Sequence, residues 1–534
     1  MKKITSIALT AVLSATLLAG CGGKADPKPA ASNNPSESSN PSPEATDQKK
    51  EPTKFSISFS TGGNKYFESS ADINKDKWVL ELEKLTNTDL DIIPIPHKEF
   101  DQKMSLIFAG NTVPDVVGNL RGGPTTPSMS GSVEAGVFMP LDDLLKEHAP
   151  NLMAQVTEDA WEYVKHDGKI YGIPSWLENP ARRATFLRMD LLEKTGLPLP
   201  KTVDEYMDVL RAFKKLGVEN PYQYRENFKY ADTFFGAYDV MPYQLEVVGD
   251  EVLPKFFDVE NMTKALEAYK TMYDEGLIPA DFASVTQADY NRNLSAGKAG
   301  MWTSNADGLL NWRSKAREAD PNAKIDIVPS PSGYEGAGGH LLASPISTTY
   351  FINSKVPKEK AIEIIKFFDW MLTEEADMFF TFGIEGENYT KEGDKINYKL
   401  PETEGGVDEQ GFRQSQLWFV HELTYNKKFV ELNPDGPDLI AGFDNILSKE
   451  GVGTIVFNPN LESYNKYPDL AAGGDTASKF IVDNIIKIIY GKAPVSDWPK
   501  VIEEWKKKGG NEIIKEATER YRNNDGVVYQ GRKQ

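Results

Sequence analysis

The only cysteine of this 534-residue chain, Cys21, follows a short apolar segment. Residues 1–20 begin with a basic stretch and continue as an apolar run up to Leu18. A run of about 15 apolar residues rises only about 23 Å as a helix, which is short of the roughly 30 Å hydrocarbon core of a membrane. We therefore predict that residues 1–20 form a secretory signal peptide. A single thiol also excludes an internal disulfide and a thiolate-rich metal site.

Other motifs that would mark an enzyme are missing from the sequence. The chain has neither a phosphate loop ending in Gly-Lys-Ser/Thr nor a Gly-x-Ser-x-Gly elbow. His421-Glu422 begins like a zinc-protease motif, but the required second histidine does not follow. Since the five histidines are scattered, we predict no metal site, no cofactor and no catalytic residue. Paired carboxylates carry no local motif, so a glycan hydrolase stays open as an alternative.

One stretch has part of the spacing of a calcium-binding loop. Lys77 stands at the position where the sharp turn of such a loop needs glycine, and the residues from Lys75 on already have a helical pattern. We interpret the acidic residues as helix caps instead. The residues with calcium-loop spacing are Asp72, Asn74, Asp76 and Glu83.

Charge and composition restrict the class of protein. Asp and Glu number 79 against 60 Lys and Arg. This excess would repel a phosphate backbone, so we predict no nucleic-acid partner. With 40% hydrophobic and 11% aromatic residues, the chain can build the cores of two or more domains. Residues 22–53 are rich in Ser and Pro and contain no aromatic residue, so we predict a disordered tether there.

The elements that must position a binding site begin after this tether. Phe55, Ile57 and Phe59 alternate with serines, which is the period of a strand. The following patterns predict helices over 74–87 and 98–109 and strands over 89–95 and 115–117. Strands joined in this way pair in parallel, and ligands bind at their carboxyl ends.

Two later helices are predicted by clear signals. Thr202 and Glu205 form a capping box before a helix over 204–216, which Gly217 stops. Another amphipathic helix begins after Pro357. The fold class is therefore α/β, organised in two lobes.

Several segments resemble the extracellular solute-binding proteins of bacterial carbohydrate ABC importers, specifically the long LipO-type lipoproteins. The sequence Leu-Ala-Gly-Cys at 18–21 closely matches the lipobox of bacterial lipoproteins. Further similar segments follow in the family's order and extend from about residue 54 to the C-terminus. They lie at 109–117 (AGNTVPDVV), 167–174 (DGKIYGIP), 187–192 (LRMDLL), 195–205, 295–302 (SAGKAGMW), 368–372 (FDWML) and 382–389 (FGIEGENY).

This resemblance implies a two-lobe, periplasmic-binding-protein-like fold, with parallel-rich sheets flanked by helices, that closes on its ligand about a hinge. It places residues 54–178 plus 342–400 in an N-terminal lobe and residues 179–341 plus 401–534 in a C-terminal lobe. Many relatives bind calcium in an acidic insertion after the helix that is predicted here over 204–216. Residues 217–222 lack that pattern, so we expect no calcium there.

The resemblance also implies a location and partners. Lipidation of Cys21 would anchor the chain through residues 21–53 at the extracellular face of the cytoplasmic membrane, and the long tether suits a Gram-positive cell. We expect a monomer that is not an enzyme. It would bind an oligosaccharide and deliver it to the transmembrane permease subunits of an ABC importer.

A carbohydrate site needs flat aromatic side chains for the apolar face of a sugar ring and planar polar groups for its hydroxyls. Loops at the carboxyl ends of strands face the cleft, and Arg121 also matches a ligand-contacting loop of the family. The predicted ligand-binding residues are Asn119, Arg121, Trp176, Trp302, Asn305, Asp307, Tyr66, Glu387 and Tyr389.

Structural roles for several of these residues stay open. Trp176 and Trp302 also fit core positions, Tyr66 fits a surface tyrosine, and Glu387 and Tyr389 fit residues that anchor the lobe. Arg121, with Arg182 and Arg183, would suit an acidic sugar. Because a shared fold does not fix the ligand, a non-sugar solute such as a peptide is an alternative, as is the lipid-anchored hydrolase.

Overall fold

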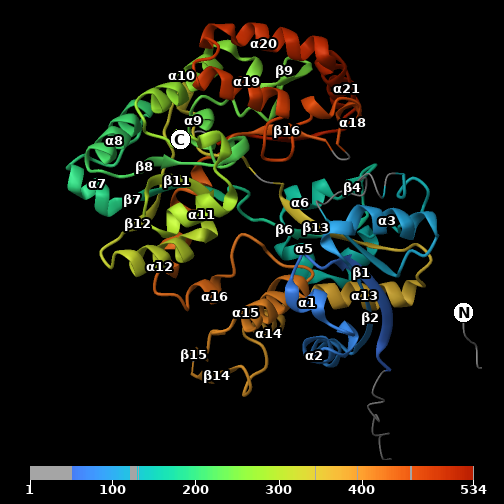
Figure 1. Ribbon diagram of the computed structural model, residues 1–534. Helices are drawn as coiled ribbons and strands as arrows, with labels where there is room; N and C mark the ends of the chain where they lie inside the picture. The colour runs from blue at the N-terminus through green and yellow to red at the C-terminus, as the bar shows by residue number, and fades with distance from the viewer. Residues whose placement is uncertain are drawn as a thin grey trace, which may run out of the picture. The chain divides into compact units, whose positions relative to one another are not determined.

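The computed structural model describes residues 51–120, 129, 131–342, 344–393, 395–457 and 460–532. All elements below belong to one compact unit, Glu51–Gln534 (Figure 1). The predicted signal peptide, Cys21 and Arg121 lie outside the described residues. In the described part of the chain, no helix is both long enough and apolar enough to cross a membrane.

The first sheet has five strands in the order β2-β1-β3-β13-β6. β1 pairs in parallel with β2 and β3, as the sequence predicts, whereas β13 is antiparallel to both β3 and β6. β1 begins at Thr53, inside the predicted tether. The five strands are β1 (Thr53–Ser60), β2 (Thr88–Ile95), β3 (Val116–Leu120), β6 (Gly172–Trp176) and β13 (Ile346–Ile352).

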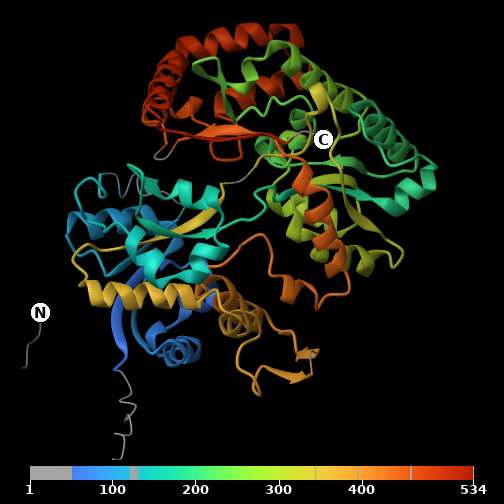
Figure 2. The ribbon, with the colours of Figure 1, turned by 180° about the vertical axis from the view of Figure 1, so that it is seen from behind.

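Helices cover both faces of this sheet. Val116 belongs to one core cluster with α2 (Lys77–Thr86) and α13 (Lys358–Trp370), while its neighbour Val117 belongs to another cluster with α3 (Phe100–Ala109). This alternation is the strand period applied to a sheet that is buried on both sides. Seen from behind, α13 runs along the sheet (Figure 2).

The predicted cap residues before α2 have that role. The Asp72 side chain accepts a hydrogen bond from the Asn74 amide, and Asp76, the N-cap of α2, accepts one from the Trp78 amide. These carboxylates satisfy amide groups that a helix start leaves without partners. The calcium-like spacing therefore belongs to two successive helix starts.

The second sheet has four strands in the order β12-β7-β11-β8. Met301 and Trp302 of β11 point into core clusters on opposite faces. The capping box of Thr202 and Glu205 is present and starts α8 (Val203–Lys215). The strands are β7 (Arg183–Arg188), β8 (Asn220–Gln223), β11 (Ala299–Asn305) and β12 (Ile325–Val328).

A third sheet combines distant parts of the chain in the order β10-β9-β16-β17. β16 pairs antiparallel with both β9 and β17, so the C-terminal segment completes a sheet begun near residue 245. Two hairpins, β4–β5 and β14–β15, complete the described strands. The bounds are β4 (Lys165–His166), β5 (Lys169–Ile170), β9 (Leu245–Val248), β10 (Glu251–Pro254), β14 (Tyr389–Glu392), β15 (Lys395–Tyr398), β16 (Thr454–Val456) and β17 (Val527–Tyr529).

The remaining α-helices surround these sheets. They are α1 (Lys65–Ser69), α4 (Asp142–His148), α5 (Pro150–Gln155), α6 (Glu158–Tyr163), α7 (Met189–Thr195), α9 (Asp232–Ala237), α10 (Val259–Asp274), α11 (Gln287–Ser295), α12 (Leu309–Ala319), α14 (Glu374–Phe382), α15 (Glu404–Gly411), α16 (Lys427–Val430), α17 (Gly436–Asn445), α18 (Ser463–Lys466), α19 (Lys479–Ile489), α20 (Trp498–Trp505) and α21 (Asn511–Arg522).

The core clusters bear on the predicted lobe boundaries. The main cluster of the first sheet extends to Val420, and its member Phe419 contacts the rings of Phe59, Tyr350 and Phe367. Residues 412–420 therefore pack with the first sheet, although the sequence-based division puts the second lobe's final segment from residue 401 on. We propose that this segment returns to the second lobe after Val420.

Substitution of Phe419 tests this assignment. Phe419→Ala removes a ring that is almost fully buried among four aromatic side chains, so we expect a loss of about 3–5 kcal/mol in the free energy of unfolding, measured with urea. Leu400→Ala, at an exposed leucine of the preceding segment, is the matched control and should change it by less than about 0.5 kcal/mol. Equal stability of both variants would contradict the assignment.

Candidate ligand site at two sheet edges

The carboxyl ends of four strands meet at one edge of the first sheet. β1, β2 and β3 are parallel, and β6 has the same direction because β13 runs antiparallel to both β3 and β6. The edge is therefore formed by Ser60, Ile95, Leu120 and Trp176, the last residues of these strands. Ligands of open α/β sheets bind at such an edge.

Polar groups at this first edge are already bonded to one another. The Ser60 hydroxyl lies 3.2 Å from His97 Nδ1, and the Thr61 hydroxyl accepts from the His97 amide and donates to Glu68. Gly62 beside them has a φ of +62°, a conformation that favours glycine, and a Cβ there would meet the mobile end of the Gln416 side chain at 2.6 Å. These bonds fix the loop after β1 against His97, which follows β2, and against Glu68 of α1.

A second edge forms in the same way on the second sheet. β8, β11 and β12 end there, and β7 begins there because it is antiparallel to β11 and β12. Arg183, the first residue of β7, lies opposite Asn305, the last residue of β11. Both Asn305 and nearby Asp307 are exposed, so their polar groups are available to a ligand.

A short connection limits the distance between the two edges. The chain leaves the first edge at Trp176 and enters the second at Arg183. Seven extended residues span at most about 25 Å. Backbone bonds join this crossing to another: the Trp176 amide donates to the His421 carbonyl at 3.3 Å, and the Leu423 amide donates to the Trp176 carbonyl at 2.8 Å. Two paired chain segments thus connect the sheets.

Four charged groups gather at the second edge. The buried Arg183 guanidinium bonds to the buried Asp232 carboxylate through Nη1 and to Asp475 Oδ2 through Nη2, at 2.6 Å for the latter. Lys229 also pairs with Asp475. The Tyr230 ring lies beside both cations, with its centroid 5.0 Å from Arg183 Cζ and 5.6 Å from Lys229 Nζ. We call Arg183, Lys229, Tyr230, Asp232 and Asp475 the charged cluster.

Protonation within the charged cluster follows from burial and pairing. Burial would lower the pKa of Arg183, but the charges of Asp232 and Asp475 outweigh this effect and raise it. Burial would raise the pKa of Asp475, but Lys229 and Arg183 hold it below its ordinary value. For Asp232, burial dominates and raises the pKa despite the neighbouring guanidinium.

The loop that presents Lys229 and Tyr230 has a strained backbone. Asn227, Phe228 and Tyr230 have φ values of 59°, 55° and 62°, a left-handed conformation that costs non-glycine residues roughly 1–2 kcal/mol each. Phe228 is buried and packs against Tyr224, Tyr269 and Phe282, so its packing can hold the loop in this shape. Such strain is concentrated at functional sites.

A buried polar network adjoins the charged cluster. His340 Nε2 lies 3.0 Å from the Thr185 hydroxyl and 3.3 Å from the Ser330 hydroxyl, and Glu450 accepts from both the amide and the hydroxyl of Ser330. His340 Nδ1 lies 4.0 Å from Asp232 Oδ2. Burial, with a contribution from the Arg183 charge, lowers the pKa of His340 well below its ordinary value.

The predicted ligand residues on the first sheet differ in accessibility. Asn119 is buried in β3 opposite Thr349, and Trp176 is buried in the main core cluster of that sheet. Tyr66 is half-buried and donates to Asp76 at 2.6 Å. Burial and the Asp76 carboxylate raise the pKa of Tyr66. These three side chains have structural partners in this structure.

The remaining predicted residues are divided between exposed and buried positions. Trp302 is only 2% exposed and stacks on Phe186, with ring centroids 5.6 Å apart. Its ring is therefore not available as a surface for a sugar. Tyr389 is buried in a separate small cluster with Phe382, and Glu387 is exposed beside it. Two of the predicted residues, Asn305 and Asp307, are exposed and lie next to the charged cluster.

Sequence reasoning missed most of the charged cluster. It singled out Arg182 and Arg183, but Arg183 is buried and paired, and Arg182 is half-buried. Asp232 and Asp475 lie 49 and 292 residues from Arg183, so no local motif could associate them. The only available signal was the position of Arg183 shortly after the predicted lobe boundary between residues 178 and 179.

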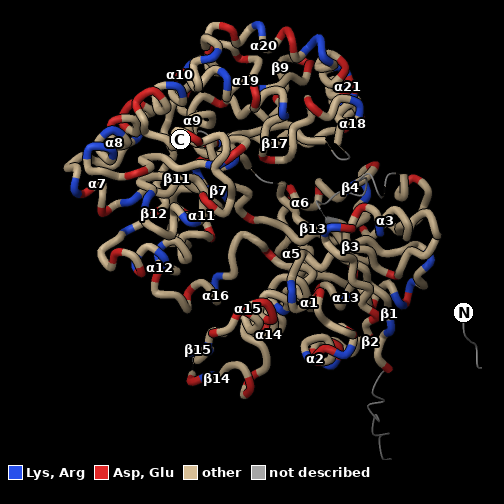
Figure 3. Tube along the Cα trace, in the orientation of Figure 1, with Lys and Arg blue, Asp and Glu red and all other residues tan. Residues whose placement is uncertain are grey.

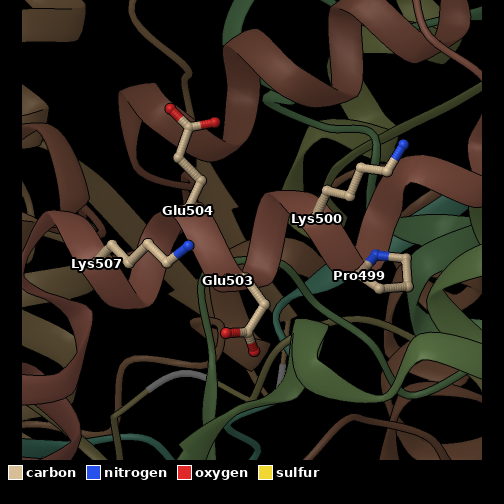
Figure 4. A pocket seen from close by; sticks show the side chains of 5 residues that line it. All are labelled: Pro499, Lys500, Glu503, Glu504 and Lys507. Atoms are coloured by element: carbon tan, nitrogen blue, oxygen red, sulfur yellow. The ribbon is translucent and has the colours of Figure 1, made fainter.

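Two hollows on the surface of the described residues are not lined by predicted ligand residues. One, of about 370 Å³, lies on α20 and is lined by Pro499, Lys500, Glu503, Glu504 and Lys507. Glu503 and Glu504 point to opposite sides of the helix (Figure 4), so no set of polar groups converges there. Basic and acidic residues also mix along outer helices such as α8 and α21 (Figure 3).

The other hollow, of about 340 Å³, lies along the third sheet. Lys255 pairs there with Asp239, and burial raises the pKa of Glu246. Its remaining lining includes residues 451–455 and 528–532. Among the described residues, no group of three or more His, Cys, Asp or Glu side chains is placed to hold a metal ion.

Comparison with known families gives one match over more than half of the chain. The family described as bacterial extracellular solute-binding protein matches residues 71–378. This range begins before α2 and ends within α14, and so it includes four strands of the first sheet and all strands of the second.

Curated relatives match over most of their length. The polygalacturonan/rhamnogalacturonan-binding protein YtcQ of Bacillus subtilis is 28% identical over 466 residues, covering 84% of this chain and 88% of the relative. Lipoprotein LipO of the same organism is 26% identical over 467 residues, covering 82% and 88%.

Solved structures of similar fold include an extracellular solute-binding protein from Bifidobacterium longum subsp. infantis. Its TM-score is 0.63 at 17% identity, covering 88% of this chain and 98% of that one. The alginate-binding protein AlgQ2 without calcium ion has a TM-score of 0.58 at 18% identity, with the same coverage. The predicted periplasmic-binding-protein-like α/β fold is confirmed by these structures.

Burial of Trp302 predicts a stability defect. Trp302→Ala would leave a cavity in the core, so we expect the free energy of unfolding to fall by about 3–5 kcal/mol in urea denaturation. Asn305→Ala, at the exposed end of the same strand, is the control and should stay within about 0.5 kcal/mol of the parent protein. A Trp302→Ala protein of unchanged stability would place the ring outside the core.

The buried His340 predicts a pH-dependent stability. An unfolded histidine takes up a proton near pH 6.5, whereas His340 stays neutral in the folded protein because its pKa is lowered. Below about pH 6.5 the unfolded state therefore binds more protons than the folded state. We expect the free energy of unfolding to fall by about 2 kcal/mol between pH 7.5 and pH 5. Urea denaturation across this range measures the loss.

The variant His340→Gln should lose about 2 kcal/mol less over this pH range than the parent protein. Burial also lowers the pKa of His421 to about 4, against the opposing bond to the Trp418 carbonyl, so part of the pH dependence should persist. His148→Gln, at a half-buried histidine beside Glu147, is the control. An identical pH dependence in His340→Gln and the parent would exclude this role for His340.

Proposed function

Because the chain belongs to the family of bacterial extracellular solute-binding proteins, we propose that it captures an oligosaccharide between its two sheet edges and delivers it to the permease of an ABC importer. The family predicted from the sequence is confirmed by the match. So is the prediction of a binding protein rather than an enzyme, because the family consists of solute-binding proteins.

The observation that carries this proposal is the short crossing between the sheets. Residues 177–182 connect the carboxyl-end edge of the first sheet to the corresponding edge of the second. A ligand held at one edge is thus within about 25 Å of the other. Since such edges bind ligands in open α/β sheets, a guest that contacts both would favour the approach of the two sheets.

The names of the relatives support a sugar as the guest. YtcQ is named for binding polygalacturonan and rhamnogalacturonan, and it matches 84% of this chain. A fructooligosaccharide-binding protein of Streptococcus pneumoniae, FusA, is 25% identical over 297 residues. At the second edge, the Tyr230 ring and the exposed Asn305 provide the two kinds of group that a sugar ring requires.

The proposed location follows from the N-terminus and the relatives. We propose that Cys21 is lipidated after removal of residues 1–20 and holds a monomer at the extracellular face of the cytoplasmic membrane. The relative LipO is named as a lipoprotein. Two or three acyl chains would suffice for stable anchoring, since each buried methylene contributes about 0.8 kcal/mol.

A ligand panel tests the proposed function. The chain without residues 1–21 is mixed with neutral oligosaccharides, uronate oligosaccharides or peptides, and thermal unfolding and tryptophan fluorescence are recorded. We expect at least one oligosaccharide to raise the melting temperature, since a ligand at 100 times its Kd stabilises the native state by about 2.7 kcal/mol. The sugar should be recovered unchanged.

A matched pair of variants locates the binding. Asn305→Ala should weaken binding about fivefold through the loss of one hydrogen bond, whereas Asn322→Ala, at an exposed asparagine before β12, should not. A response to peptides and to no glycan would reject the sugar assignment. Sugar fragments that accumulate with time would revive the hydrolase alternative.

A further inference from the structure

We propose that Asp475 is an internal substitute for a ligand carboxylate, and that a sugar acid displaces it from Arg183 and Lys229. The inference rests on the proposed oligosaccharide-binding function and adds the chemical class of one bound residue, a uronate. It also assigns a role to the turn that carries Asp475.

The contacts of Asp475 are those that a bound uronate would make. Its Oδ2 accepts from Arg183 Nη2 at 2.6 Å and from Lys229 Nζ. The Tyr230 ring lies beside both donors, and an aromatic face suits the C–H groups of a sugar ring. Two cations that lie against one aromatic ring thus hold a carboxylate that the protein itself supplies.

The balance of charge permits an exchange of one carboxylate for another. Arg183 and Lys229 contribute two positive charges, and Asp232 and Asp475 contribute two negative charges. Withdrawal of Asp475 would leave one positive charge without a counterion. Because an uncompensated, partly buried charge is unfavourable, an incoming carboxylate that restores neutrality is strongly preferred over a neutral group.

The two acids of the charged cluster differ in how firmly they are fixed. Asp232 is 2% exposed and belongs to α9. The Asp475 side chain is 29% exposed. Displacement by a ligand from solution therefore concerns Asp475, while Asp232 keeps the guanidinium oriented.

Asp475 lies at the tip of a tight turn that has few constraints. The Gly473 and Thr476 backbones bond to each other in both directions at 3.0 Å, which leaves Gly474 and Asp475 as the two central residues. Gly474 has a φ of +60° with open space where a Cβ would be, and Gly473 and Gly474 are exposed. The turn can therefore move as a unit without disturbing a packed core.

The opposite wall of the site is rigid. The left-handed residues Asn227, Phe228 and Tyr230 are stabilised by the packing of Phe228 among buried aromatic rings. This arrangement fixes Lys229 and Tyr230 in position before a ligand arrives. Fixed hydrogen-bond donors opposite a movable acceptor, Asp475, are what the exchange of Asp475 for a ligand carboxylate requires.

Asp475→Asn tests the proposal with a matched pair of ligands, trigalacturonate and its fully methyl-esterified form. In the parent protein, Asp475 competes with the ligand for Arg183 and Lys229. The apparent affinity is therefore the intrinsic affinity multiplied by the fraction of molecules in which Asp475 has left the site. We therefore expect Asp475→Asn to bind trigalacturonate about tenfold more tightly than the parent protein, with unchanged affinity for the ester. Isothermal titration measures both, and the melting temperature verifies folding.

Two further variants separate this effect from a change of net charge or of folding. Asp469→Asn removes an exposed acid from the same segment and should bind like the parent. Lys229→Met should weaken trigalacturonate binding about tenfold, through loss of a charged hydrogen bond, and leave the ester unaffected. This variant also tests the site if Asp475→Asn does not fold.

Three results would overturn the inference. In the first, Asp475→Asn binds trigalacturonate no more tightly than the parent protein. In the second, Asp475→Asn gains the same affinity for the acid and for the ester. In the third, no variant binds trigalacturonate. Each of these leaves the proposed function standing if another oligosaccharide raises the melting temperature. A different result contradicts the proposed function itself, namely that no glycan of the panel changes the melting temperature or the tryptophan fluorescence.

Discussion

The buried guanidinium of Arg183 is the group on which the arrangement of the second edge depends. It lies at the start of β7 with 6% of its surface exposed, and a cation removed from water to this extent costs several kcal/mol unless it is paired. Asp232 and Asp475 supply the pairing from two other parts of the chain. Ion pairs with Arg183, the first residue of β7, therefore help to fix the positions of α9 and of the turn at 473–476.

This ion-pair requirement acts together with the topology of the crossing segments. Arg183 follows the crossing from Trp176, and that crossing is bonded to residues 421–424. The Glu178 amide donates to the Glu422 carboxylate and the Asn179 amide to the Thr424 hydroxyl. The ion pairs of Arg183, the crossing from Trp176 and the second sheet edge therefore occupy neighbouring positions.

Local sequence patterns predicted the elements well, but they could not reveal the tertiary partners of side chains at the sheet edges, for a physical reason. The alternation at Phe55, Ile57 and Phe59 and the capping box at Thr202 and Glu205 involve residues that are close in sequence, and both are present. Burial of Trp302 depends instead on β11 lying between β7 and β8 with helices on both faces. No pattern within β11 contains that information.

The charged cluster is even less predictable from local patterns, because Asp232 and Asp475 lie 49 and 292 residues from Arg183 in the sequence. Phe419 is comparable, since its partners on β1, β13 and α13 determine that it packs with the first sheet. In both cases the side chain type was visible in the sequence, but its partners were set by tertiary pairing. The proposed return of the chain to the second lobe after Val420 rests on tertiary contacts of the same kind.

Stability alone is a weak explanation for the charged cluster. Well-packed apolar residues of similar volume are often as stabilising as a buried ion pair, and the loop beside it adds three left-handed residues at a further energetic cost. A sequence selected only for stability would avoid both features. Their occurrence together, at the edge where β8, β11 and β12 end and beside an exposed asparagine, is better explained by recognition. Fixed donors and an aromatic ring, prepared at a cost in folding free energy, reduce what a ligand must reorganise on binding.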